Sequence, residues 1–302
     1  MKYLSKFLSI VLISILVFTF TGCSTASQKG EYIIDAKAAI ELIKGDNVVI
    51  VDTQKSVPYS KEHVKGSVNI ARIDIVKNDP FTNMLANKDQ FEKVMNSTGI
   101  SNDSTVIIYD TNDNMDSARL WWSMRVYGHE NVKVVSGGLE ALRKAGAEIT
   151  SEKTAITKSN YTAKEKNQNM IATLDDVKAQ INDPSDNVVI LDTRSLDEFN
   201  AGTIPSSVLI DYAENNYIDG TYKSIQDLKI LYLENDITPD NTVMMYCKTS
   251  IRGAQTYLAL YNAGYENLKL YDGAWVEWSS DESLPVQTPV ENKIESNEQD
   301  NS

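Results

Sequence analysis

The chain has 302 residues, of which 42% are apolar and 24% charged, so it is long enough for two ordinary domains with a hydrophobic core in each. It carries 29 Lys and Arg residues against 42 Asp and Glu, a formal net charge of −13. A surface of this sign repels the phosphates of nucleic acid and anionic lipid headgroups. These values exclude a miniprotein that depends on disulfides, and they argue against nucleic acid as a partner.

Residues 1–23 have the pattern of an export signal. Two lysines precede the apolar run Phe7–Phe20, which is shorter than the roughly 20 residues of a membrane-spanning helix. The following Cys23 resembles the lipidated cysteine of bacterial lipoproteins, although Phe20 stands where that family usually has Leu. The resemblance implies export, with a lipid on Cys23 attaching the protein to the outer face of the bacterial cytoplasmic membrane and with residues 24–35 as a tether.

The rest of the chain is a duplication. Residues 47–53 recur as 187–193 with six of seven residues identical, and two further blocks recur in the same order. A repeat period of this length predicts two domains rather than the short units of a solenoid. We expect domains at 36–150 and 171–287, joined by a polar linker at 151–170 and followed by a disordered acidic tail at 288–302.

The second copy alternates short β-branched runs with longer amphipathic ones, and Gly264 supplies a left-handed helix stop. Continuous apolar strands between helices predict an α/β fold with a mostly parallel sheet covered by helices on both faces. The predicted helices are 174–181, 224–234 and 253–262, and the predicted strands are 188–191, 243–246 and 268–271.

The candidate reactive group is Cys247, the one cysteine besides Cys23. An apolar strand ends at Tyr246 and a helix begins near Arg252, so Cys247 opens a tight six-residue loop at the sheet edge where ligands bind. Main-chain N–H groups at a helix start, with Lys248 and Arg252 nearby, favour negative charge and lower the pKa of a thiol. The pattern predicts a nucleophilic thiolate and an anion-binding loop; the alternative is a buried core cysteine beside two solvated basic residues.

With these motifs, residues 36–287 resemble the rhodaneses, or thiosulfate sulfurtransferases, in their tandem two-domain form. Cys247–Arg252 resembles the active-site loop of that family, and Asp192-Thr193-Arg194 with Glu198-Phe199 resembles the start of its catalytic domain. Further matches are Gly202–Pro205, Asp219–Ser224 and Tyr271–Trp278, and in the first copy Ala118 to His129. The resemblance implies two rhodanese-like domains, of which the second is catalytic.

The function implied by the resemblance is transfer of sulfane sulfur from thiosulfate to cyanide or a thiol through a persulfide on Cys247. This function is expected to need no cofactor and no metal, and no general base is needed if the thiol is already ionised. The substrate-binding residues would be Lys248, Thr249, Ser250, Ile251 and Arg252 of the loop, and Arg194 as a second contact for the anion. Two loop residues depart from the family, because Lys248 replaces Arg and Ser250 replaces Gly, and each change bears on donor preference.

The first copy lacks the nucleophile. Asp110 stands in place of Cys247, with Asp113 and Asp116 close behind it. We expect this copy to be structural and to bury an interface against the second. Three aspartates alone are a poor calcium cage, so metal binding is disfavoured. Both histidines, His63 and His129, lie in this copy and are interpreted as surface or packing residues.

Other functions remain as alternatives. A mercaptopyruvate sulfurtransferase would carry an uncharged loop, so the basic loop favours thiosulfate. A cysteine phosphatase or arsenate reductase needs one more residue between Cys247 and Arg252. A non-enzymatic sulfur carrier or redox partner would use the same residues and stays open.

Overall fold

The structure is a computed structural model and describes residues 32–289. The predicted signal, Cys23 and nearly all of the acidic tail lie outside the described residues, so the export and lipidation hypotheses stay predictions. Within residues 32–289, no helix combines the length and the apolar character needed to cross a bilayer.

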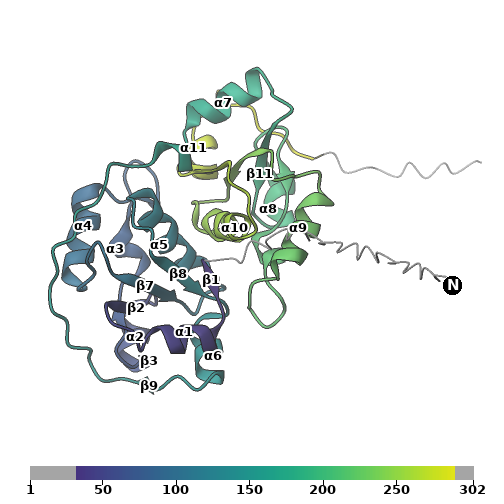
Figure 1. The fold of residues 1–302 in the computed structure, drawn as a ribbon. Helices are drawn as coiled ribbons and strands as arrows, with labels where there is room; N and C mark the ends of the chain where they lie inside the picture. Colours follow the sequence, from purple (N-terminus) through teal and green to yellow (C-terminus); the bar gives the residue numbers. More distant parts are fainter. Residues whose placement is uncertain (1–31, 290–302) are drawn as a thin grey trace, which may run out of the picture.

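The first domain is built on a five-stranded sheet in the order β1-β8-β7-β2-β4, in which every pairing is parallel (Figure 1). Two short antiparallel pairs, β3–β9 and β5–β6, flank that sheet. The elements in chain order are β1 (Ile33–Ile34), α1 (Ala36–Leu42), β2 (Val48–Asp52), α2 (Ser56–Lys61), β3 (His63–Val64), β4 (Val68–Asn69), α3 (Arg72–Ile75), β5 (Val76–Lys77), β6 (Met84–Leu85), α4 (Lys88–Ser97), β7 (Thr105–Tyr109), α5 (Met115–Val126), β8 (Val132–Val135), α6 (Gly138–Lys144) and β9 (Ile149–Thr150).

The second domain repeats this plan with the sheet order β10-β14-β13-β11-β12, again parallel throughout. Its elements are η1 (Gln168–Met170), β10 (Ile171–Ala172), α7 (Leu174–Asn182), β11 (Val188–Asp192), α8 (Leu196–Ala201), β12 (Val208–Leu209), η2 (Tyr212–Asn215), α9 (Ile225–Leu233), β13 (Thr242–Tyr246), α10 (Ile251–Asn262), β14 (Leu268–Tyr271) and α11 (Ala274–Trp278). The predicted helices and strands are confirmed to within two residues, and Gly264 has the expected positive φ of 92°.

Both faces of each sheet are covered because successive strand residues point to opposite sides. In β7, Val106 and Ile108 enter one core, whereas Ile107 and Tyr109 enter the other with α1 and α6. In the second domain α7 and α11 cover the outer face of the sheet, and α9 and α10 cover the inner one. The predicted parallel sheets with helices on both faces are confirmed.

The inner faces of the two domains share one hydrophobic core, in which α5 packs against α10 (Figure 1). The Trp121 ring of α5 lies 6.2 Å from the Tyr257 ring of α10. The predicted interface between the copies is therefore confirmed. The linker between the domains also contributes to this core, because Tyr161 within it is 4% exposed.

The register of the second sheet positions the candidate site. Asp192 of β11 pairs with Tyr246 of β13, and the Thr193 N–H donates to the Tyr246 carbonyl at 2.9 Å. Since both strands end at the same edge, Cys247 and Arg194 leave the sheet side by side. The histidines lie elsewhere in the first domain, and both are buried and hydrogen-bonded to backbone carbonyls, as packing residues are.

Candidate active site

The loop that begins at Cys247 turns sharply into α10. Cys247 is 1% exposed at residue level, and Ser250, the residue before the helix, has a left-handed backbone with φ 64° and ψ 4°. That conformation costs a non-glycine residue roughly 1–2 kcal/mol. The Ser250 hydroxyl offsets part of the cost by donating to the carbonyls of Tyr271 (2.7 Å) and Asp272 (2.9 Å). The position does require a positive φ, which explains why Gly is usual there in the resembling family.

The loop presents main-chain donors that the protein itself leaves open. Among residues 32–289, the N–H groups of Thr249 and Ser250 donate to no protein acceptor, and those of the first turn of α10 have no partner within the helix. A row of such N–H groups at a helix start forms a concave site for an anion. The geometry therefore fits a negatively charged ligand.

Arg252 is fixed beside the thiol by Glu198 of α8. Its two terminal nitrogens, Nη1 and Nη2, donate to the Glu198 carboxylate at 2.5 and 2.8 Å. The ion pair lowers the pKa of Glu198 to about 2 against the effect of burial. Burial opposes the charge on Arg252, but its interactions with Glu198 and Cys247 outweigh burial and raise the pKa of the guanidinium. The sequence does not indicate that Glu198 pairs with Arg252, although the spacing Ser195-x-x-Glu198 marks the capping box at the start of α8.

Arg194 follows the strand that pairs with β13, and its guanidinium is already hydrogen-bonded within the second domain. It donates to both carboxylate oxygens of Asp192 and to the Gly202 carbonyl, and its Cζ lies 4.3 Å from the Trp275 ring centroid. The side chain is 2% exposed. The structure thus shows Arg194 supporting the sheet edge, and its role as a second anion contact stays a prediction.

The remaining loop residues differ in setting. Lys248 is exposed and forms no ion pair within the described part of the chain, whereas Ile251 is buried at the start of α10. Thr249 is half-buried, and its hydroxyl accepts a hydrogen bond from Asn83 of the first domain at 3.0 Å. The active-site loop is therefore in contact with the other domain, which the sequence did not predict.

The first domain has an equivalent loop, and its own side chain fills it. The Asp110 carboxylate accepts the N–H groups of Asn112 (3.1 Å), Asn114 (3.1 Å) and Ser117 (3.0 Å), and the Ser117 hydroxyl as well. Burial raises the pKa of Asp110 to about 6 even though these donors act in the opposite direction. Asn114, with φ 63°, has the backbone conformation of Ser250.

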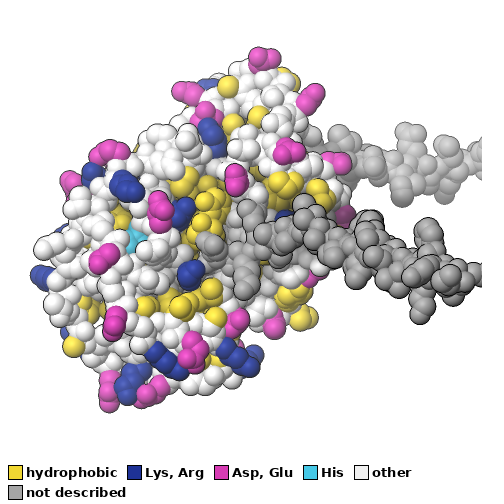
Figure 2. Space-filling model, viewed as in Figure 1, with side chains coloured by type: hydrophobic (Ala, Val, Ile, Leu, Met, Phe, Trp, Pro, Cys, Tyr) yellow, Lys and Arg dark blue, Asp and Glu magenta, His cyan; other side chains and the backbone are white. Residues whose placement is uncertain are grey.

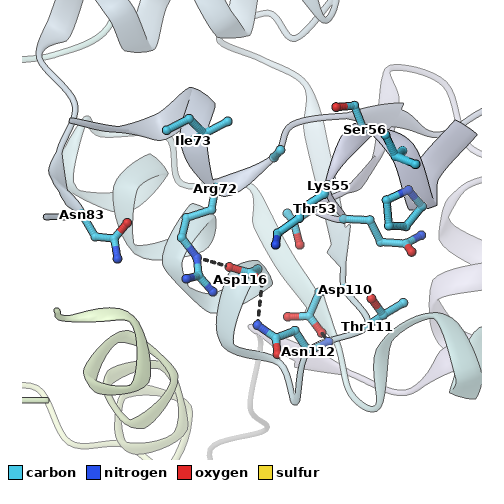
Figure 3. A pocket seen from close by; sticks show the side chains of 14 residues that line it. Thr53, Lys55, Ser56, Arg72, Ile73, Asn83, Asp110, Thr111, Asn112 and Asp116 are labelled. Atoms are coloured by element: carbon cyan, nitrogen blue, oxygen red, sulfur yellow. Dashed lines mark hydrogen bonds and ion pairs between the residues drawn. The ribbon is translucent and has the colours of Figure 1, made fainter. Parts of the chain in front are cut away.

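A pocket of about 860 Å³ opens over this edge of the first domain (Figure 3). Arg72 and Asp116 form an ion pair across it at 2.5 Å, and Asn112 donates to Asp116 at 2.8 Å. Figure 3 shows Asp110 on the opposite side of the pocket from Ile73. Across residues 32–289, no three His, Cys, Asp or Glu side chains are arranged to hold a metal ion.

Charge is mixed over the visible surface. On the face shown in Figure 2, Lys and Arg side chains are scattered among Asp and Glu rather than gathered into a basic patch.

The structure thus has two tandem α/β domains, and the second carries a cysteine at the head of the loop that leads into α10. The rhodanese-like domain model matches residues 35–145 and again 173–281. The chain belongs to the rhodanese family, and it is a tandem, sulfurtransferase-type member.

Comparison with individual proteins agrees with this assignment. A protein of Saccharopolyspora erythraea, provisionally named a thiosulfate sulfurtransferase, is 29% identical over 282 residues, which cover 87% of this chain and 99% of that one. The sulfur carrier protein TtuD of Thermus thermophilus is 29% identical over 248 residues, covering 76% and 86%. A structure of EanB with hercynine matches with a TM-score of 0.80 at 19% identity over 88% of this chain and 71% of that one, which shows the shared fold.

Proposed function

We propose that the protein is a thiosulfate sulfurtransferase that carries sulfane sulfur as a persulfide on Cys247. The observation that supports this best is the contrast between the two loops. In the first domain three backbone N–H groups bind the carboxylate of Asp110. In the second domain the shorter Cys247 side chain leaves such donors open, so a small external anion can take the place of that carboxylate.

The chemistry needs few groups. The Cys247 thiolate attacks the outer sulfur of thiosulfate, the new S–S bond forms, and the old S–S bond breaks with its electron pair leaving on sulfite. Cyanide or a thiolate then attacks the outer sulfur of the persulfide and is released as thiocyanate or as a new persulfide. The S–S bond to Cys247 breaks, and its electron pair regenerates the Cys247 thiolate. This double displacement replaces one difficult transfer with two easier ones.

Charge in the loop suits both half-reactions. The N–H groups and Arg252 stabilise the thiolate and the persulfide, and Lys248 pairs with the sulfonate end of the donor. Because Glu198 holds Arg252 through two hydrogen bonds, the guanidinium is already oriented before substrate binds. No proton transfer by a histidine is required.

A second candidate is a sulfur carrier that passes its persulfide to a client protein. The likeness to TtuD, which is named a sulfur carrier protein, favours it. The two functions share the persulfide and differ in the donor and acceptor that support turnover.

The test is a thiosulfate–cyanide assay on the full chain, with intact-mass detection of the sulfur adduct and 3-mercaptopyruvate as a parallel donor. We expect thiocyanate formation and a gain of one sulfur on Cys247 with thiosulfate alone. Cys247→Ser, which keeps the size of the side chain, should lose at least ~10³-fold in turnover with an unchanged unfolding midpoint. Persulfide formation only with a protein donor would select the carrier, and turnover by Cys247→Ser would exclude Cys247 as the nucleophile.

A further inference from the structure

The two domains exchange contacts at each other's loops. From the first domain, the turn between β5 and β6 reaches the catalytic loop, where Asn83 donates to Thr249. From the second domain, the segment after η2 reaches the first loop, where Asn114 donates to the Gly220 carbonyl at 2.9 Å. The Leu85 N–H donates to Asp272 at 2.7 Å, and this contact joins β6 to the residue that follows β14.

Asp272 is the point at which the first domain meets the support of the catalytic loop. Its carboxylate accepts Leu85 and the Nη2 of Arg119 on α5, at 2.7 Å each, while its main-chain carbonyl accepts the Ser250 hydroxyl. Arg119 also donates to the Asn83 carbonyl at 2.8 Å. One guanidinium therefore fixes both structures that touch the loop, namely Asp272 under Ser250 and Asn83 beside Thr249.

Burying Arg119 is costly for the protein. The residue is 0% exposed, and within residues 32–289 its Nε and Nη1 atoms have no hydrogen-bond partner. Its Cζ lies 4.7 Å from the Trp122 ring centroid. A buried ion pair with unpaired nitrogens contributes little net stability compared with apolar packing, so its value lies in fixing one arrangement.

We propose that Arg119 of the non-catalytic domain is a positioning residue for the Cys247 loop, acting through Asp272 and Asn83. This inference rests on the proposed role of Cys247 as the nucleophile. It assigns the first domain a part in the chemistry: without Arg119, Asp272 and the turn at Asn83 lose their common anchor. Ser250 and Thr249 then relax, and the open N–H groups of the loop no longer hold their positions beside Cys247. Displacements of about 1 Å in such a site are enough to cost one to two orders of magnitude in rate.

The chain offers a matched control. Arg125 is also on α5 and also reaches the second domain, where it donates to the Tyr261 hydroxyl at 3.2 Å and lies over that ring at 5.7 Å. Tyr261 belongs to the far end of α10, away from the loop. Arg125→Met therefore loosens the domain interface without touching the Asp272 contact.

The experiment compares Arg119→Met, Arg119→Lys and Arg125→Met in the full chain. The rate of Cys247 carboxamidomethylation by iodoacetamide is followed by peptide mass spectrometry from pH 5 to 9, with thermal unfolding as the check on folding. We expect Cys247 in Arg119→Met to be alkylated about tenfold more slowly at pH 7, with the midpoint of the pH profile moved to higher pH. We expect the rate and the profile of Arg125→Met to match those of the wild type. Since a single nitrogen of Arg119 makes both contacts, the Lys variant should recover most of the rate.

The alkylation readout does not depend on turnover, so a protein inactive toward thiosulfate still tests the positioning role. Equal losses in Arg119→Met and Arg125→Met, or a wild-type profile in folded Arg119→Met, would overturn it. If Arg119→Met does not fold, Asn83→Gly replaces it, because Asn83 is half-buried and has a φ of 64° that glycine adopts freely. We expect that variant to alkylate about threefold more slowly, and an unchanged rate would again overturn the proposal.

Discussion

The loops of the two domains share one backbone architecture but differ in the side chain at the head of the loop. Each follows a central strand, ends in a left-handed residue and leads into a 12-residue helix, α5 or α10. In the first domain Asp110 places its own carboxylate among the N–H groups, and in the second Cys247 does not. The fold thus places backbone N–H groups at the same loop in both domains, and one side chain decides whether a carboxylate of the protein itself occupies them.

The charged residues around the two loops also differ, with an acidic residue in the first domain where the second has a basic one. The second residue of the helix is Asp116 in the first domain and Arg252 in the second, and each is held by an ion pair of opposite polarity, with Arg72 or Glu198. Gln54 also occupies the place of Arg194 after the paired strand. The first loop therefore lacks the cysteine and also the basic residues at the positions of Arg252 and Arg194, which fits a domain without a nucleophile.

Among variants that keep Cys247, the largest expected effect comes from giving the second loop the charge that the first loop has at this position. Arg252→Asp places a carboxylate beside Glu198 and the thiol, so we expect at least ~100-fold slower sulfur transfer and alkylation of Cys247. Arg252→Lys keeps the charge but loses the paired hydrogen bonds, and should lose about tenfold. Both rates are measured at pH 7 beside unfolding midpoints. Activity retained in the Asp variant would mean that the loop N–H groups alone suffice.

A smaller effect concerns pH and the first domain. The pKa of Asp110 is raised to about 6 when folded, so the folded state binds the proton more tightly than the unfolded chain. The resulting contribution to the free energy of unfolding, on the order of 2 to 3 kcal/mol, is fully present below about pH 4, near the pKa of Asp110 in the unfolded chain. It is lost as the pH rises through 6. Asp110→Asn should abolish this decrease in the free energy of unfolding with rising pH, as measured by urea unfolding at pH 4, 5, 6 and 7.

The control for that measurement is Glu198→Gln. The pKa of Glu198 is lowered to about 2 by Arg252, so its stabilisation is present above about pH 4.5 and lost only as pH falls toward 2. This variant should therefore keep the wild-type slope between pH 5 and 7 and lose the slope in acid. Sulfur transfer by Asp110→Asn should stay within about twofold of wild type. A slope between pH 4 and 7 that survives in Asp110→Asn would show that another group carries it.

The sequence predicted the fold well because its signals are local or repeated. The recurrence of residues 47–53 as 187–193, the apolar strands and the stop at Gly264 define two parallel sheets without any long-range knowledge. Cys247 and Arg252 were found because they are five residues apart in one loop. The contacts of Glu198, Asp272 and Arg119 could not be predicted, because their partners lie 54 and 153 residues away and only the packed chain brings them together.

The smallest expected effect separates backbone strain from hydrogen bonding at Ser250. Ser250→Gly removes the two hydrogen bonds to the carbonyls of Tyr271 and Asp272 but relieves the left-handed backbone, so the free energy of unfolding should change by less than ~1 kcal/mol. Ser250→Ala loses the same hydrogen bonds and keeps the strain, so it should be less stable than the Gly variant by about 1 kcal/mol. Urea unfolding of the two variants measures the difference directly. An Ala variant as stable as the Gly variant would show that the backbone at residue 250 relaxes once its hydroxyl is gone.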